Sequence, residues 1–270
     1  IDIENIKNVP LILGERDIFK VATTLPGIKT TGEGSAGFNV RGGKDDQNLF
    51  LLDDAVLYNP SHFLGFFSSV NPFTTKKADI YKGSIPAEFG GRLSSVFDIK
   101  SKSGNTEKVS GEAGIGPVMS NVTLEIPVIK GKSSLLLGGR ASYSDWILKA
   151  IKDSNLENSQ ASFYDILLKY NHQLSKKDNL ETSFYYSHDK YSISSDSVYK
   201  YSNQLASVKW NHDFNEKNKS SFIITSSNYK FNIDYNSQPQ KSFDYGYRIN
   251  ETQFIFKMKY IMNEKNVFNY

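Results

Sequence analysis

Residues 121–128 read Asn-Val-Thr-Leu-Glu-Ile-Pro-Val, with an apolar side chain at every even position. Because successive side chains of a β-strand point to opposite faces, this alternation predicts a strand with one apolar and one polar face. The same period of two returns downstream in the segments 135–143, 164–170, 206–214, 223–233 and 254–260. With the residues that flank each alternating stretch, the predicted strands are about 10 to 14 residues long, which exceeds an average soluble strand and suits a tilted strand that crosses a membrane.

The connections between these runs alternate in length. Short polar turns are expected at 129–132, 175–179, 215–218 and 263–266, and long polar loops at 145–160, 190–200 and 232–243. Short turns on one side and long loops on the other are typical of outer-membrane β-barrels, with Tyr and Phe at the strand ends as interfacial girdles. A soluble β-sandwich is the alternative, and it would have shorter strands and loops of more uniform length.

Counting along this half gives eight strands and the start of a ninth at residues 267–270. A barrel of only eight strands would be filled by its own side chains and could not enclose another unit. We therefore expect an incomplete antiparallel transmembrane β-barrel, of which this chain supplies the first strands.

The first 106 residues predict a small α+β unit with many glycine turns. Apolar spacing indicates a helix at 15–24, and Asn71-Pro72 is a good start for a short helix to residue 77. Short strands are expected at 38–40, 48–52, 56–58, 78–82 and 94–100. The composition changes near residues 102–105, so the predicted domains are 1–106 and 107–270.

Composition excludes several classes of protein. The 270 residues carry a formal net charge of +3 and no cysteine. Disulfides, thiolate metal sites and cysteine nucleophiles are therefore excluded, and a dedicated nucleic-acid-binding protein would be more basic. No run of about 18 apolar residues predicts a transmembrane helix. The start at Ile1, without Met or a signal-peptide pattern, is interpreted as a mature or trimmed end.

Enzyme and metal signatures are weak. The glycines at 32–37 match the dinucleotide pattern G-x-G-x-x-G, but they follow a predicted helix and lead into a strand, which is the wrong context for binding pyrophosphate. The aspartates at 45, 46, 53 and 54 lack calcium-loop spacing, and a solvated turn plus a strand-end pair is the favoured interpretation. No two of the four histidines have zinc-ligand spacing. No catalytic residue, metal ligand or cofactor is predicted.

Two sets of motifs in the first hundred residues resemble one known family. The first set is Leu25-Pro26-Gly27-Ile28, Phe38-Asn39-Val40-Arg41-Gly42-Gly43 and Leu51-Leu52-Asp53-Asp54-Ala55-Val56-Leu57-Tyr58-Asn59. The second is Lys82-Gly83-Ser84-Ile85-Pro86-Ala87-Glu88-Phe89-Gly90-Gly91-Arg92, followed by Val96 and Lys102-Ser103-Gly104. In this order they resemble the plug domain of TonB-dependent outer-membrane receptors. The family usually has Asp-Gly where this chain has Asp53-Asp54, so the turn there is expected to differ.

The resemblance implies a bacterial outer-membrane importer whose plug blocks the lumen of a 22-stranded barrel. It implies a scarce cargo (siderophore, vitamin, glycan or peptide) and a TonB complex of the inner membrane that acts through a motif absent from this chain. It further implies contact with outer-membrane lipid, and it allows for a surface lipoprotein as an additional partner. Transport driven by the proton-motive force needs no covalent chemistry from the receptor. The alternative function is a soluble or surface β-rich glycan-binding protein, which would partition into the aqueous phase without detergent.

Candidate site residues follow from the plug motifs. Tyr58, Asn59, His62 and Phe63 are predicted as cargo contacts at the plug apex, because they combine apolar area with a few polar groups. The competing interpretation makes the phenylalanines of this segment core residues. Arg41 and Arg92 are predicted as structural charges directed at the barrel wall, since the resemblance pairs the Arg of the Val-Arg-Gly motif with barrel glutamates.

Overall fold

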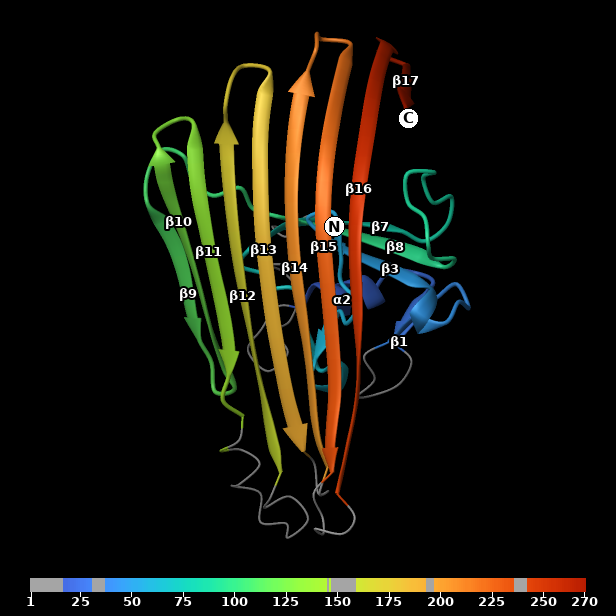
Figure 1. The fold of residues 1–270 in the computed structure, drawn as a ribbon, viewed down its shortest axis with the longest axis vertical. Coiled ribbons are helices and arrows are strands. Elements are labelled where there is room, and N and C mark those ends of the chain that lie inside the picture. The colour runs from blue at the N-terminus through green and yellow to red at the C-terminus, as the bar shows by residue number, and fades with distance from the viewer. Residues whose placement is uncertain (1–16, 31–36, 145, 147–158, 193–196, 236–241) are drawn as a thin grey trace.

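The computed structural model describes residues 17–30, 37–144, 146, 159–192, 197–235 and 242–270. A curved layer of long strands, green to red in Figure 1, runs alongside a smaller unit, blue to cyan, that lies against one of its faces. We call these the wall (β9–β17) and the N-terminal unit (residues 17–101). No helix in the described ranges is long and apolar enough to cross a membrane.

The N-terminal unit is built around a four-stranded sheet of order β4-β3-β8-β7, in which β3 and β8 run parallel. Its larger elements are α2 (Ile18–Thr23), β1 (Ile28–Thr30), β2 (Phe38–Val40), β3 (Asn48–Leu52), β4 (Ala55–Val56), β7 (Thr75–Tyr81) and β8 (Ser95–Ser101). Its smaller ones are η1 (Asp45–Gln47), β5 (Ser61–His62), η2 (Phe63–Gly65) and β6 (Phe67–Ser68). The expected strands are found within a few residues of their predicted positions.

Four phenylalanines form the centre of this unit: Phe19, Phe38, Phe50 and Phe97. The rings of Phe50 and Phe97 stack with centroids 4.6 Å apart, and Phe19 meets both edge-on. Helix α2 begins after Asp17, whose Oδ1 accepts hydrogen bonds from the amides of Phe19 and Lys20. This cap satisfies amides that a first helical turn leaves unpaired and so fixes where Phe19 enters the core.

The predicted helix at 71–77 is wrong. Asn71 instead starts a single turn, in which its Oδ1 accepts from the amide of Phe73 and its carbonyl accepts from the amide of Thr74. The chain then enters β7 at Thr75 and pairs with β8. A side-chain-capped turn and a helix start share the same Asn-Pro signal, and the strand partner decided between them.

The wall is an antiparallel sheet of nine strands in sequence order within the described residues. Its strands are β9 (Ser110–Ile115), β10 (Met119–Ile129), β11 (Ser133–Ser142), β12 (Gln160–Gln173), β13 (Asp178–Ser192), β14 (Ser197–Asp213), β15 (Asn218–Tyr235), β16 (Phe243–Asn263) and β17 (Asn266–Asn269). The four short turns lie where they were predicted. The sheet is not closed in this chain, as expected for part of a barrel.

The long loops were predicted too long. Residues 190–192 and 197–200 belong to β13 and β14, and residues 232–235 belong to β15. The remaining loop residues 145, 147–158, 193–196 and 236–241 lie outside the described residues. Polar composition indicated loops here, but strands continue through these polar segments because backbone pairing with their neighbours persists.

Strand β12 shows how the two faces of the wall differ. Phe163, Asp165 and Lys169 are buried beneath the N-terminal unit, whereas Tyr164 and Ile166 on the opposite face are 41% and 43% exposed. The outer face is thus the apolar one, and the polar inner face meets the N-terminal unit. This arrangement confirms the alternation predicted for this strand.

Strand β15 departs from that rule partway along its length. Its odd-numbered apolar residues Ile223 and Tyr229 are buried against the N-terminal unit. The outer face carries Phe222 and Ile224 first, and then polar side chains from Ser226 onward. Toward the end of the wall that bears the 236–241 connection, the pattern therefore inverts to polar outside and aromatic inside.

Candidate functional site

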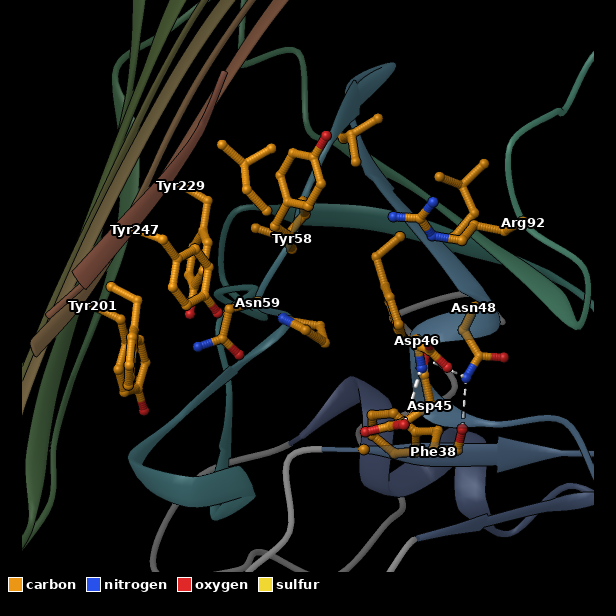
Figure 2. A pocket seen from close by; sticks show the side chains of 18 residues that line it. Phe38, Asp45, Asp46, Asn48, Tyr58, Asn59, Arg92, Tyr201, Tyr229 and Tyr247 are labelled. Carbon is orange, nitrogen blue, oxygen red and sulfur yellow. Dashed lines mark hydrogen bonds between the residues drawn. The ribbon is translucent and has the colours of Figure 1, made fainter. Parts of the chain in front are cut away.

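A cavity of about 480 Å³ lies between the N-terminal unit and strands β14–β16. Figure 2 shows Tyr201, Tyr229 and Tyr247 projecting from the wall toward Tyr58 and Asn59 of the N-terminal unit. Two of the four predicted cargo contacts, Tyr58 and Asn59, therefore line this space.

Tyr58 follows β4 and reaches across to the wall. Its hydroxyl donates to the carboxylate of Glu251 on β16, and its ring lies 6.4 Å from that of Tyr229. Burial, and then the Glu251 carboxylate, raise the pKa of Tyr58 to about 12, so it remains a neutral donor. The hydroxyl is thus held by the wall, and the ring is left to border the cavity.

Asn59 is held through its backbone. Its amide donates to Oδ1 of Asn203 (3.3 Å), and its carbonyl accepts from Nδ2 of the same residue (3.1 Å). The Oδ1 of Asn59 accepts from the amide of Ser61. This pairing with β14 fixes the height of the Asn59 loop along the wall.

The cavity is mainly apolar and aromatic, with its charged groups confined to the N-terminal unit. The wall contributes tyrosines together with Phe231 and Ile249, and the N-terminal unit contributes apolar side chains such as Phe50 and Leu57 together with Asp45, Asp46 and Arg92. Broad apolar area with a few charged groups at one edge is the combination that binding sites for small molecules show.

His62 and Phe63 lie elsewhere, in the contact between the N-terminal unit and the wall. His62 is fully buried, with Nδ1 2.8 Å from Asp189 Oδ2 and Nε2 3.3 Å from Asp165 Oδ2. Burial alone would lower the pKa of His62, but the carboxylates of Asp189 and Asp165 raise it. Phe63, at a φ of 45°, donates its amide to Asp189 Oδ1 and packs its ring on Phe66.

Arg140 of β11 completes this buried ionic group. Its Nε donates to Asp165 Oδ2 (2.7 Å), its Nη2 donates to the carbonyl of Ser68 (2.6 Å), and its guanidinium lies over the Phe163 ring. Tyr185 of β13 donates to the carbonyl of Ser69. The guanidinium of Arg140 and the imidazole of His62, when it is protonated, thus face two carboxylates in a buried region, and such pairing is a condition for burying charge.

A second ionic cluster forms at the turn between β3 and β4. Asp53 contacts Lys169 (3.0 Å), and Asp54 contacts both Lys100 (2.7 Å) and Lys209 (3.2 Å). Asp53 and Asp54 have φ values of 48° and 73°, so they adopt the left-handed turn that glycine favours. The ion pairs offset this backbone strain of about 1–2 kcal/mol per residue. They also engage the carboxylates of Asp53 and Asp54, two of the four aspartates considered above as calcium ligands.

Replacing Asp54 with Asn should weaken the N-terminal unit by about 2 kcal/mol at pH 7. Burial would raise the pKa of Asp54, but Lys100 and Lys209 lower it from 3.8 to about 2. This stabilisation is present above pH 3.8 and is lost as pH falls toward 2. Hydrogen exchange of β3 and β4 in the full-length protein should show this acid sensitivity, and Asp54→Asn should abolish it. Asp79→Asn, at an exposed pair with Lys77, is the control and should have little effect.

Arg41 and Arg92 both lie on the surface of the N-terminal unit. Arg41, at a φ of 49°, packs its side chain over Gly27 and Gly83, and Arg92 donates to the carbonyl of Gly91. Their pairing with barrel carboxylates stays a prediction. The wall residues that contact the N-terminal unit were missed as a set, although Arg140, Asp165, Lys169 and Asp189 all occupy inner positions of alternating strands.

No group of three or more His, Asp or Glu side chains in the described residues could hold a metal ion. The dinucleotide-like glycines at 32–37 lie mostly outside the described residues. The described residues therefore offer ionic contacts between the two parts and a cavity between them.

Residues 12–95 match the family model "TonB-dependent Receptor Plug Domain". No curated protein matches the chain. A mutant of the ferric enterobactin receptor PfeA from Pseudomonas aeruginosa matches with a TM-score of 0.73 at 15% identity, over 96% of this chain and 46% of that one. The siderophore receptor PirA from Acinetobacter baumannii gives 0.68 at 15% identity, over 96% and 44%. The outer membrane transporter YddB from Escherichia coli gives 0.65 at 12%, over 96% and 45%.

These likenesses concern the fold, and the chain spans less than half the length of each matched structure. The predicted architecture, an N-terminal α+β unit followed by antiparallel barrel strands, is confirmed. The matched proteins are receptors and transporters of the outer membrane, and the predicted location there is confirmed with them.

Proposed function

Residues 12–95 are a TonB-dependent receptor plug domain, and from this premise we propose that the chain forms the plug and first barrel strands of an outer-membrane importer. The N-terminal unit is this plug. The observation that carries the proposal is the plug's position on the inner face of the wall, where buried ion pairs join His62 to Asp165 and Asp189 and Asp53 to Lys169. A unit placed this way obstructs the lumen and must rearrange before cargo can pass.

The partners follow from the same proposal. A TonB complex in the inner membrane would supply energy from the proton-motive force, through a segment that these residues do not include. The apolar outer face of the wall would contact outer-membrane lipid. A surface lipoprotein that covers the extracellular opening is a further partner that such an importer can have, and a glycan-binding role without transport is the alternative function.

The cavity gives the best indication of cargo chemistry. Its wall side is formed by uncharged aromatic side chains, and its single lining cation is Arg92 among the described residues. Such a surface suits cargo with flat apolar faces and hydroxyl groups better than a strongly anionic complex, which would need several cations. Two similar structures are a PfeA mutant in complex with enterobactin and the copper transporter OprC. We therefore do not propose enterobactin or copper as the cargo of this chain.

A growth screen tests the function directly. A strain lacking the full-length receptor is grown with single sources of iron, vitamin, glycan or peptide, each at a limiting concentration. We expect one source to become unusable, and to be restored by the wild-type gene only when the proton-motive force is intact. Equal growth of both strains on every source would refute the proposal.

For the nutrient found in this way, Asn59→Ala and Tyr247→Ala should each weaken binding to the purified receptor about tenfold. Both side chains border the cavity, and their loss removes a polar contact or a stacking surface. Tyr164→Ala removes a tyrosine from the outer face of the wall and is the matched control. Equal affinities in all three variants, measured by titration calorimetry, would place the cargo site elsewhere.

A further inference from the structure

The plug meets the wall in two different ways. Toward β10–β13 its contacts are buried and polar: His62 with Asp165 and Asp189, and Asn71 with Asn121 through two reciprocal amide hydrogen bonds of 2.9 and 3.0 Å. We call this contact region the seat. Breaking it would leave charges and amides without partners away from water, which is costly.

Toward β16, three cavities lie between the plug and the wall. Their volumes are about 480, 280 and 780 Å³. The first and second share the lining residues Leu49 and Val56, and the second and third share Glu88, Ile255 and Lys257. They therefore follow one another along the inner face of β16.

Among the described residues, two polar contacts with β16 cross this row of cavities, beside the Lys257 ammonium over the Phe89 ring (5.6 Å) and the Asp54–Lys209 ion pair with β14. Tyr58 bonds to Glu251, which lies on β16 between Ile249 of the first cavity and Gln253 of the second. Glu88 contacts Lys257 at 2.5 Å where the second and third cavities meet. The Lys257 and Glu88 side chains are 33% and 38% exposed, so their pair holds far less free energy than the buried seat.

We propose that cargo passes between the plug and β16, through the contacts Tyr58–Glu251 and Glu88–Lys257, while the plug remains on its seat. The inference rests on the proposed import function and specifies its route. Breaking these two contacts costs little free energy because their polar groups become hydrated. Breaking the seat would leave charged groups buried without partners. The route begins at the aromatic cavity and ends among Lys257, Lys259 and Lys219.

Two tethers in the full-length receptor distinguish the sides. On the seat, a Cβ built at Gly138 of β11 lies 3.5 Å from Cβ of Thr74, within the range of a disulfide. Thr74→Cys with Gly138→Cys therefore locks the plug to β11 on oxidation. On the route, Glu88→Cys with Lys257→Cys is joined by a short bismaleimide. Thr74→Cys alone and Glu88→Cys alone are the controls.

The readout is labelling by fluorescein maleimide of a reporter cysteine, in cells grown in rich medium with or without a protonophore. Gln253→Cys reports on the route, and Ser183→Cys reports on the buried inner face of β13. We expect energised cells to label Gln253→Cys faster, with the seat tether leaving this unchanged and the route tether abolishing it. Ser183→Cys should stay protected throughout.

The other outcomes separate the two proposals. Labelling of Gln253→Cys that is lost with the seat tether, or that survives the route tether, overturns the route. Energy-dependent labelling of Ser183→Cys overturns it as well, because the plug would then have left its seat. If neither reporter responds to the protonophore while the growth screen also finds no nutrient, the import function itself has failed.

Discussion

Replacing His62 with Leu is expected to detach the plug segment 61–68 from the wall, at a cost of about 3–5 kcal/mol. The imidazole lies between Asp165 and Asp189 in complete burial. Among the described residues, its loss leaves the amide of Phe63 as the remaining hydrogen-bond donor to Asp189. Hydrogen exchange of β5 and β6 in the full-length receptor should accelerate accordingly. Unchanged protection of the β5 and β6 amides would show that the His62 contacts do not stabilise the docking of this segment on the wall.

Two further variants identify the cause. Adding Asp189→Asn to His62→Leu should restore part of the lost protection, because it removes the unpaired charge. Lys77→Ala, which breaks an ion pair whose side chains are 50% and 38% exposed, should have little effect. If the double variant is no better than His62→Leu, lost packing against Phe163 explains the change and not the stranded carboxylate.

The same histidine predicts a pH dependence. Because its pKa is raised in the folded protein, its stabilisation is complete below its ordinary value of 6.5 and is lost as pH rises through the raised pKa. The stabilisation from Asp54 has the opposite pH dependence, because it is lost only as the pH falls below about 3.8. Docking should thus be tightest in mildly acidic solution, and exchange of β5 in His62→Leu should lose the alkaline sensitivity.

The second large effect is expected from one methyl group. In Gly138→Ala the new Cβ would overlap the Cγ2 methyl of Thr74, which is buried in the plug turn beneath β11. Because this methyl is one bond from Cβ on a buried, β-branched side chain that has little freedom to move aside, we expect a loss of about 3 kcal/mol in plug docking. Release of the plug by urea from the folded barrel, followed by limited proteolysis, measures it.

Neighbouring positions provide the controls for Gly138→Ala. Gly139→Ala on the opposite face of the same strand meets no atom closer than 3.9 Å and should behave as wild type. Thr74→Ser removes the obstructing methyl and keeps the hydroxyl that donates to the carbonyl of Asn71, so it should rescue Gly138→Ala. Additive losses in that pair would contradict the steric explanation.

The sequence predicted the elements of this fold better than their contacts. Alternation in a strand is a local property, so β12 could be assigned its apolar and polar faces from Tyr164 and Asp165 alone. The strands β13, β14 and β15 were predicted too short because their polar ends resemble loops in composition. The turn at Asn71 was read as a helix because its cap is common to both.

The candidate site was predictable only in part. Tyr58 and Asn59 line the cavity, as a mixed polar and aromatic segment suggested. His62 belongs to the same segment but its partner Asp189 is 127 positions away, and no local pattern pairs them. The inner charges of the wall were visible as single residues, yet their meaning depends on which plug group lies opposite.

The inversion of faces along β15 and β16 limits how much of the wall a membrane can bury. Beyond Phe254 the outward positions of β16 become Thr252, Asn250 and Arg248, and this polar stretch extends to Asp244 over roughly 30 Å of strand. Hydrocarbon would not solvate these groups, so this half of the wall stands clear of the bilayer as a rigid collar. A bilayer can therefore bury only the other half of the wall, and the inner tyrosines Tyr229 and Tyr247 line a stretch whose outer side faces water.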